Sequence, residues 1–144
     1  MTLETKLRAS DAPHKLGVQW DRNTWPSFSR AEMACRHCGE SYIWPEFMSR
    51  LQNARDMSGR PYIILSGHRC GLHNARVGGA PLSQHLKLAA DIRLSGHEPR
   101  RLYQICKTMG FRGFGFYATF LHIDLGPKRV WYGNQKAKRL WQAY

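Results

Sequence analysis

The sequence predicts an α+β domain in which two main helices pack on a small, mostly antiparallel sheet, with one long loop beside it. Two segments show helical periodicity in their apolar residues, and several short runs are apolar and rich in β-forming side chains. The stretch 66–84 is rich in Gly, Ser, Asn and His and has no periodicity. Loops of this length in a compact domain are often functional. The 144 residues suffice for one domain with its own core.

The first part of the chain is expected to contain an arm, a helical turn and one long helix. Residues 1–27 have mixed charge and two tryptophans, and we expect an irregular arm packed on the domain. Ser29-Arg30-Ala31-Glu32 is a capping box, which predicts the start of a short helical turn. A helix is expected from residue 45 to about residue 57, because one helical face there is apolar: Ile43, Phe47, Leu51 and Ala54.

The second part of the chain combines strands with one more helix. Pro99 opens a helix that runs to about residue 109, where Gly110 closes it. Residues 134–144 carry three basic side chains and no acid, and we expect a basic tail after a central domain of residues 28–133. Short strands are expected at residues 62–65, 88–94, 114–117, 120–125 and 129–132.

The charge of the chain is strongly positive, with 22 Lys and Arg against 10 Asp and Glu, a formal net charge of +12. Such a charge attracts polyanions: nucleic acid, anionic lipid or the acidic polymers of a bacterial envelope. No helix-turn-helix or RNA-binding signature accompanies it, so nucleic acid is the partner we favour least. No apolar run reaches the roughly 20 residues of a membrane helix, so no membrane span is expected. Because no apolar segment follows Met1, we expect no Sec signal peptide and synthesis in the cytoplasm.

The four cysteines are Cys35, Cys38, Cys70 and Cys106. In a chain made in the cytoplasm, free thiols or metal ligands are expected rather than disulfides. Cys35-x-x-Cys38 is half of a zinc-ribbon pattern, but no second Cys-x-x-Cys pair follows it. We expect two partly buried thiols in a turn here, with a second, structural zinc at Cys35 and Cys38 as the alternative.

Polar residues stand where the strand pattern predicts core. His85 lies just before the strand that carries Asp91, and His122 and Asp124 alternate within Phe120-Leu121-His122-Ile123-Asp124-Leu125. A period of two places His122 and Asp124 on one face. An ionised Asp on a buried face is unfavourable unless it is paired or bound to a metal. The pattern fits two readings: a catalytic zinc shell of two His and one carboxylate, or a hydrogen-bonded pair on a solvated face.

Several short motifs occur in a fixed order along the chain: Ser66-Gly67-His68-Arg69-Cys70, Ser83-Gln84-His85, Ala89-Ala90-Asp91-Ile92, Leu121-His122-Ile123-Asp124 and Trp131-Tyr132. In this order they resemble the zinc D-Ala-D-Ala carboxypeptidase family of peptidoglycan metallopeptidases, over roughly residues 28–133. The wider superfamily also contains phage endolysins and the hedgehog signalling fold. The resemblance therefore implies that fold, with the long loop at the metal site.

By this resemblance, His85, Asp91 and His122 are the ligands of one catalytic zinc ion. The general base is the less defined role. Several relatives carry Asp or Glu three residues before the last zinc His, where this chain has Thr119. Asp124 is then the nearest candidate for the catalytic base, and its alternative role is to orient a metal ligand.

The resemblance also implies a substrate-binding group. Arg69 would bind a substrate carboxylate, because a guanidinium meets a carboxylate with two parallel hydrogen bonds. His68 stands where the family has an aromatic residue, usually Tyr, and Ser83 would support the metal loop or the substrate. His85 and Asp91 are six residues apart where the family has seven, and the family's glycine between them is missing. This shorter turn either still brings both ligands to one metal or weakens metal binding.

The expected function is that of a zinc peptidase that cuts peptidoglycan stem peptides or cross-links, as a D-Ala-D-Ala carboxypeptidase or an endopeptidase. Peptidoglycan peptides and an anionic cell wall are the expected partners. Small size and high positive charge suit a phage or prophage endolysin or a virion-borne wall hydrolase, which reaches the wall by a holin-type route or in a virion. The alternative is a non-catalytic, zinc-containing binding module on the same fold. The short spacing and Thr119 favour that alternative.

Overall fold

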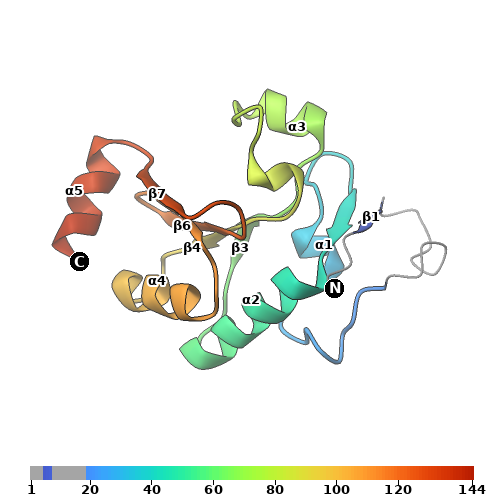
Figure 1. Ribbon diagram of the computed structural model, residues 1–144, viewed down its shortest axis with the longest axis horizontal. Coiled ribbons are helices and arrows are strands. Elements are labelled where there is room, and N and C mark those ends of the chain that lie inside the picture. Colours follow the sequence, from blue (N-terminus) through green and yellow to red (C-terminus); the bar gives the residue numbers. More distant parts are fainter. Residues whose placement is uncertain (1–4, 8–18) are drawn as a thin grey trace.

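Five strands form one mixed sheet, in the order β3-β4-β6-β5-β7, in a computed structural model that describes residues 5–7 and 19–144 (Figure 1). Neighbouring strands are antiparallel except β5 and β7, which are parallel. The strands are β3 (Ile64–Ser66), β4 (Ala90–Arg93), β5 (Gly113–Phe116), β6 (Phe120–Asp124) and β7 (Arg129–Tyr132). The α+β class and the mostly antiparallel sheet predicted from the sequence are confirmed.

Two helices pack together against one face of this sheet: α2 (Pro45–Ser58) and α4 (Pro99–Thr108) (Figure 1). Both begin with proline in the first turn, where its missing N–H leaves no bond unmade. Gly59 ends α2 in the left-handed conformation, with φ of +64°. The core between helices and sheet contains Phe47, Met48 and Leu51 from α2, Leu102 and Ile105 from α4, and Ile92, Leu121 and Ile123 from the strands. The two predicted main helices are confirmed.

The predicted helical turn after Ser29 is α1 (Arg30–Met33), and its capping box is formed, with the Glu32 side chain accepting from the Ser29 N–H. Of the expected N-terminal arm, residues 1–4 and 8–18 lie outside the described residues. Strand β1 (Thr5–Leu7) pairs antiparallel with β2 (Ser41–Ile43), a small sheet that the sequence did not predict. Trp25, near the end of the expected arm, is buried in the core, so this part of the arm packs on the domain.

The sequence predicted no helix after residue 133, but α5 (Gln135–Ala143) forms there and packs on β5 and β7 (Figure 1). The Asn134 side chain caps it by accepting from the Ala137 N–H at 2.8 Å. Trp141 is buried, with its ring 4.7 Å from that of Phe116, and its Nε1 donates to the Tyr117 carbonyl at 2.8 Å. These residues of the expected basic tail therefore form a helix that packs on the sheet.

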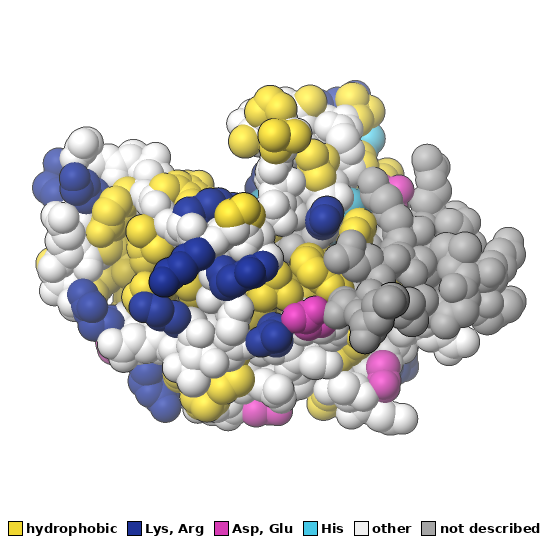
Figure 2. Space-filling model, viewed as in Figure 1, with side chains coloured by type: hydrophobic (Ala, Val, Ile, Leu, Met, Phe, Trp, Pro, Cys, Tyr) yellow, Lys and Arg dark blue, Asp and Glu magenta, His cyan; other side chains and the backbone are white. Residues whose placement is uncertain are grey.

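The long loop at residues 66–84 contains a further helix, α3 (Gly71–Arg76), followed by a 3-10 helix at Gln84–Leu86. Helix α3 stands off the sheet, on the side away from α2 and α4 (Figure 1). Among the described helices, none is long and apolar enough to cross a membrane. Lys and Arg side chains are spread over the face shown in Figure 2, where acidic side chains are fewer.

Candidate functional site

Strand register brings the polar residues of the sheet into rows on the face opposite α2 and α4, which we call the site face. Asp91 of β4 is the direct partner of His122 on β6, and His122 is opposite Gly115 of β5. Asp124, two residues along β6, is opposite Gly113. The alternation predicted for His122 and Asp124 is therefore what the structure shows, with Leu121 and Ile123 on the core side.

His85 comes to this face from the 3-10 helix rather than from a strand. The Ser83 hydroxyl accepts from the His85 N–H at 3.2 Å and so caps this helix. The His85 Nδ1 lies 2.6 Å from the Gly67 carbonyl oxygen. These contacts aim Nε2 at Asp91, whose Oδ1 is 3.1 Å away. The six-residue spacing between His85 and Asp91 therefore still brings the two side chains together.

The tautomers of the two histidines follow from their outer contacts. A carbonyl oxygen only accepts, so the His85 Nδ1 carries the proton and its Nε2 keeps a lone pair. On the other ring, the His122 Nε2 donates to Asp124 Oδ2 at 2.6 Å, which leaves a lone pair on Nδ1. That Nδ1 is 2.9 Å from Asp91 Oδ1 and 3.2 Å from His85 Nε2. Three acceptor atoms therefore face one another in a buried place.

Such a cluster requires positive charge at its centre. Burial lowers the pKa of His122, but the carboxylates of Asp124 and Asp91 on either side of the ring raise it above its ordinary value. Burial likewise raises the pKa of Asp91, yet His122 and His85 hold it well below its usual range. Two imidazole nitrogens and one carboxylate oxygen about 3 Å apart are a donor set that zinc accepts, with a fourth position left for water. His85, Asp91 and His122 therefore fit a zinc ion.

Asp124 lies behind His122, on the far side of the ring from this cluster. The side chain is fully buried. Its Oδ1 accepts from the Gly126 N–H and from Arg129 Nη1, each at 2.9 Å, and its Oδ2 accepts from His122 and from Arg129 Nη2. Burial raises the pKa of Asp124, but its bonds to His122 and Arg129 outweigh this and hold it well below its usual range. This geometry is that of a carboxylate that orients a ligand histidine.

Arg129 had no predicted role, and a glycine on the neighbouring strand makes room for it. A Cβ at Gly113 would collide with Asp124 Oδ1 and Arg129 Nη1. In the next row, a Cβ at Gly115 would lie 2.6 Å from the Trp131 ring, which packs 5.1 Å from the ring of His122. The two glycines of β5 thus let β7 side chains reach those of β6.

Arg69 borders the cluster. Its Nη2 is 3.7 Å from Asp91 Oδ2, and its Nη1 donates to the Asn74 side-chain oxygen at 3.4 Å. Asn74 is buried and also donates to the Ala80 carbonyl at 2.9 Å, so it joins Arg69 to the loop beyond α3. Gly79 leaves the space for this arrangement, because a Cβ there would collide with the Asn74 side chain.

His68 is placed differently from its expected role beside the substrate. It is 1% exposed, with Nδ1 2.6 Å from the Lys87 carbonyl and Nε2 3.1 Å from Glu40 Oε2. It does not line the cavity at the site face. Thr119, where relatives have an acid, lies in the turn between β5 and β6 and is also outside that lining.

A cavity of about 520 Å³ opens over the cluster. Arg69, Ser83, His85, Asp91 and His122 all contribute to its lining. Its other wall is aromatic and comes from Tyr117, Phe120 and Trp131. Among the described residues that line it, Asp91 is the sole carboxylate.

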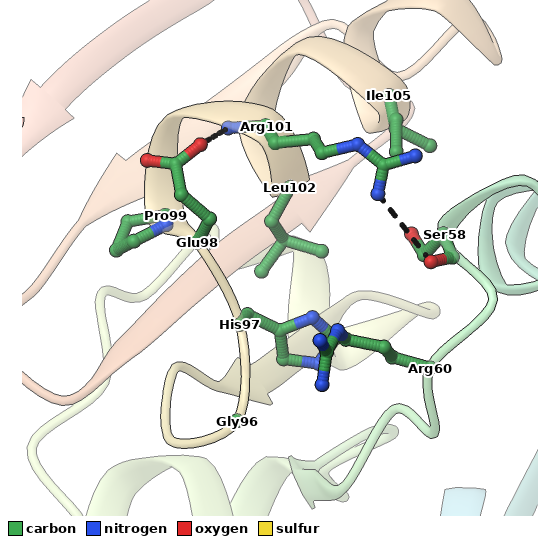
Figure 3. Close-up of a pocket in the computed structure, with 9 residues that line it drawn as sticks. All are labelled: Ser58, Arg60, Gly96, His97, Glu98, Pro99, Arg101, Leu102 and Ile105. Atoms are coloured by element: carbon green, nitrogen blue, oxygen red, sulfur yellow. Dashed lines mark hydrogen bonds between the residues drawn. The ribbon is translucent and has the colours of Figure 1, made fainter.

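A second cavity, of about 600 Å³, lies where α2 ends and α4 begins, and it shares no lining residue with the first (Figure 3). Arg101 spans it, with Nη1 3.4 Å from the Ser58 carbonyl and its N–H donating to Glu98 (Figure 3). Both contacts belong to helix ends, and no cluster of candidate metal ligands lies there among the described residues. We therefore place the functional site at the first cavity.

The chain matches a known protein family. A family model described as Peptidase M15 matches residues 26–124. This segment contains the three candidate metal ligands, Arg69 and Asp124, and it ends before Arg129. No curated protein matches the chain.

Proposed function

Because the chain belongs to the Peptidase M15 family of zinc-dependent peptidases, we propose that it hydrolyses peptide bonds in the stem peptides or cross-links of bacterial peptidoglycan. It would act as a D-Ala-D-Ala carboxypeptidase or as an endopeptidase. One observation carries the proposal: the lone pairs of His85 and His122 and the carboxylate of Asp91 converge at the base of a cavity.

His85, Asp91 and His122 hold the metal, and Asp124 keeps the His122 ring in the tautomer that binds it. A zinc ion held by these three residues would supply polarisation of the scissile carbonyl and a water molecule of lowered pKa. Asp124 is a positioning residue in this scheme, because both of its oxygens are taken by His122, Arg129 and the Gly126 N–H.

Arg69 supplies substrate recognition. A stem peptide ends in a carboxylate, and the guanidinium at the cavity edge offers two parallel donors to it. The partners of Arg69 within the protein are long or shared, at 3.3 Å to Ser66 Oγ and 3.4 Å to Asn74 Oδ1. Donor capacity therefore remains for a ligand. The aromatic wall and a volume of about 520 Å³ suit a short peptide segment.

The positive surface supports action on a cell wall. The chain has a formal net charge of +12, and Lys and Arg side chains are spread over the face seen in Figure 2. This charge favours residence on the acidic polymers of a bacterial envelope. We propose a phage or prophage endolysin or a virion-borne wall hydrolase, delivered by a holin-type route or in the virion.

The test is digestion of purified muropeptides, with and without a metal chelator, and identification of the products by mass. Loss of a terminal D-Ala identifies a carboxypeptidase, and cleavage within the stem or cross-link identifies an endopeptidase. His122→Ala is the matched inactive control, because two ligands hold zinc poorly. Intact muropeptides with zinc-loaded protein would overturn the proposal. That result would favour a non-catalytic zinc module. One observation supports this alternative: the described cavity lining contains no second carboxylate.

A further inference from the structure

Three cysteines from two distant segments meet outside the cavity described above. The sulfurs of Cys35, Cys38 and Cys70 all lie within 4.8 Å of one another, and all three are free thiols. Cys35 and Cys38 follow α1, and Cys70 is the N-cap residue of α3. The sequence pattern predicted only the first pair, because Cys70 is 35 residues from Cys35.

The first pair lies in a turn, and one of its sulfurs accepts a backbone hydrogen bond. The Cys35 Sγ accepts from the Cys70 N–H at 3.3 Å. Gly39 adopts φ of +74° and donates to the Cys35 carbonyl at 2.9 Å, which closes the turn. Donors of this kind stabilise a thiolate, the form of cysteine that binds metals.

Helix α3 presents a second pair. Cys70 and His73 are three residues apart at its first turn, a spacing that puts two side chains on one face. The Cys70 Sγ accepts from the His73 N–H at 3.4 Å. Cys70 therefore adds a third sulfur to the Cys35-Cys38 pair, and His73 follows it by three residues in α3.

Two imidazoles are candidates for a fourth ligand, and the hydrogen bonds of His37 separate their roles. The rings of His37 and His73 are stacked, with centroids 6.0 Å apart. Arg76 Nη1 lies 3.2 Å from His37 Nε2, and a guanidinium only donates, so His37 Nε2 accepts. The proton of His37 is then on Nδ1, 3.6 Å from the Cys70 Sγ, and in this tautomer Nδ1 has no lone pair for a metal. His73 is the imidazole that remains available.

We propose that Cys35, Cys38, Cys70 and His73 bind a second, structural zinc ion. Three thiolates and one imidazole form a closed tetrahedral shell that is typical of structural zinc. The ion would join the end of α1 to the segment that carries Arg69. The two are already in contact, because the His68 N–H donates to the Met33 carbonyl at 2.9 Å. The proposal does not depend on the peptidase activity.

The test is elemental analysis of protein purified under reducing conditions without a metal-affinity tag. We expect two zinc ions per chain in the wild type. Cys38→Ser should retain one, and because Cys38 is exposed this variant should still fold. His122→Ala should also retain one, so the two sites are counted separately. Cys106→Ser is the matched control, because Cys106 lies in the core, where burial raises its pKa to about 12, and should retain two.

The fourth ligand is tested by two neighbouring histidines. His73→Ala should lose the second zinc, and His37→Ala should keep it with affinity lowered by about 10–100-fold. Cobalt substitution of His122→Ala should show thiolate-to-cobalt charge transfer, and Cys38→Ser should weaken that band. One zinc per wild-type chain, or a mass that reveals a disulfide among these cysteines, would overturn the site. Loss of zinc from His37→Ala alone would overturn the assignment of His73.

Discussion

Arg129 holds Asp124 by both carboxylate oxygens, with Nη1 2.9 Å from Oδ1 and Nη2 2.8 Å from Oδ2. Asp124 in turn accepts from His122, whose other nitrogen faces Asp91. A line of contacts thus runs from the partly exposed Arg129 on β7 to the three candidate metal ligands. Asp124, in the middle of this line, is buried and ionised, and both of its oxygens already accept hydrogen bonds. It can therefore set the orientation of His122 but has no free oxygen for a substrate proton.

Asp124→Asn should lower zinc affinity by about 10–100-fold, the usual effect of losing a partner that orients a ligand. The amide cannot serve both neighbours, because its nitrogen would face the donors of Arg129 or the His122 N–H. Chelator competition measures the affinity, and kcat at saturating zinc is the second readout. We expect kcat to change much less than the roughly 10²–10⁴-fold typical of a lost general base. A fall of that size with unchanged zinc affinity would instead make Asp124 the base.

Arg69→Lys should reduce kcat/KM for substrates with a free carboxylate by about 10–100-fold, as expected for a charge-assisted hydrogen bond worth roughly 1.5–3 kcal/mol. Zinc content should be unchanged. For substrates with an amidated terminus, kcat/KM should be the same for the variant and the wild type, because these substrates have no carboxylate to bind. Arg139→Lys, on an exposed position of α5, is the control. Equal losses on both substrate types would exclude a carboxylate-binding role.

Gly113→Ala should destabilise the fold by about 1–3 kcal/mol, because its Cβ would push apart Asp124 and Arg129 in a packed place. Zinc affinity should fall with it. Gly71→Ala is the matched control, since a Cβ at Gly71 meets nothing within 4 Å. Urea unfolding of both variants measures the effect, and equal stabilities would show that the strand adjusts to the extra methyl group.

Trp141→Ala should destabilise the protein by about 3–5 kcal/mol, as large-to-small changes of buried aromatics do. The variant loses the packing on Phe116 and the bond to the Tyr117 carbonyl. Lys138→Ala, on the exposed side of α5, should stay within about 0.5 kcal/mol of the wild type. Thermal unfolding compares the two, and similar melting temperatures would mean that α5 contributes little to the fold.

Local signals in the sequence predicted most of the elements. Pro99, the capping box at Ser29 and the apolar face of residues 45–57 predicted three helices, and each helix forms there. Alternation in β6 placed His122 and Asp124 on one face, as the structure has them. Helix α5 also had a local signal, the cap at Asn134 and the spacing of Ala137 and Trp141, but the excess of basic residues suggested a tail.

Long-range relationships could not be predicted in the same way. Arg129 reaches Asp124 only because β7 lies parallel beside β5 and because Gly113 leaves room. Cys70 joins Cys35 through the placement of α3, which no spacing rule encodes. The burial of His68 depends on Glu40 and the Lys87 carbonyl, both distant in the chain. Strand order and loop placement decide these contacts, and a single sequence holds no local pattern for them.

Asp91 on β4 pairs directly with His122 on β6, so metal binding at this site depends on the correct register of the two strands. A slip of one residue between β4 and β6 would turn the side chains of one strand to the opposite face, so an apolar neighbour would replace a ligand. A chain that has collapsed with the wrong register would then hold no ion at this site. In a refolding mixture, the zinc retained by His85, Asp91 and His122 would count the molecules whose strands paired correctly.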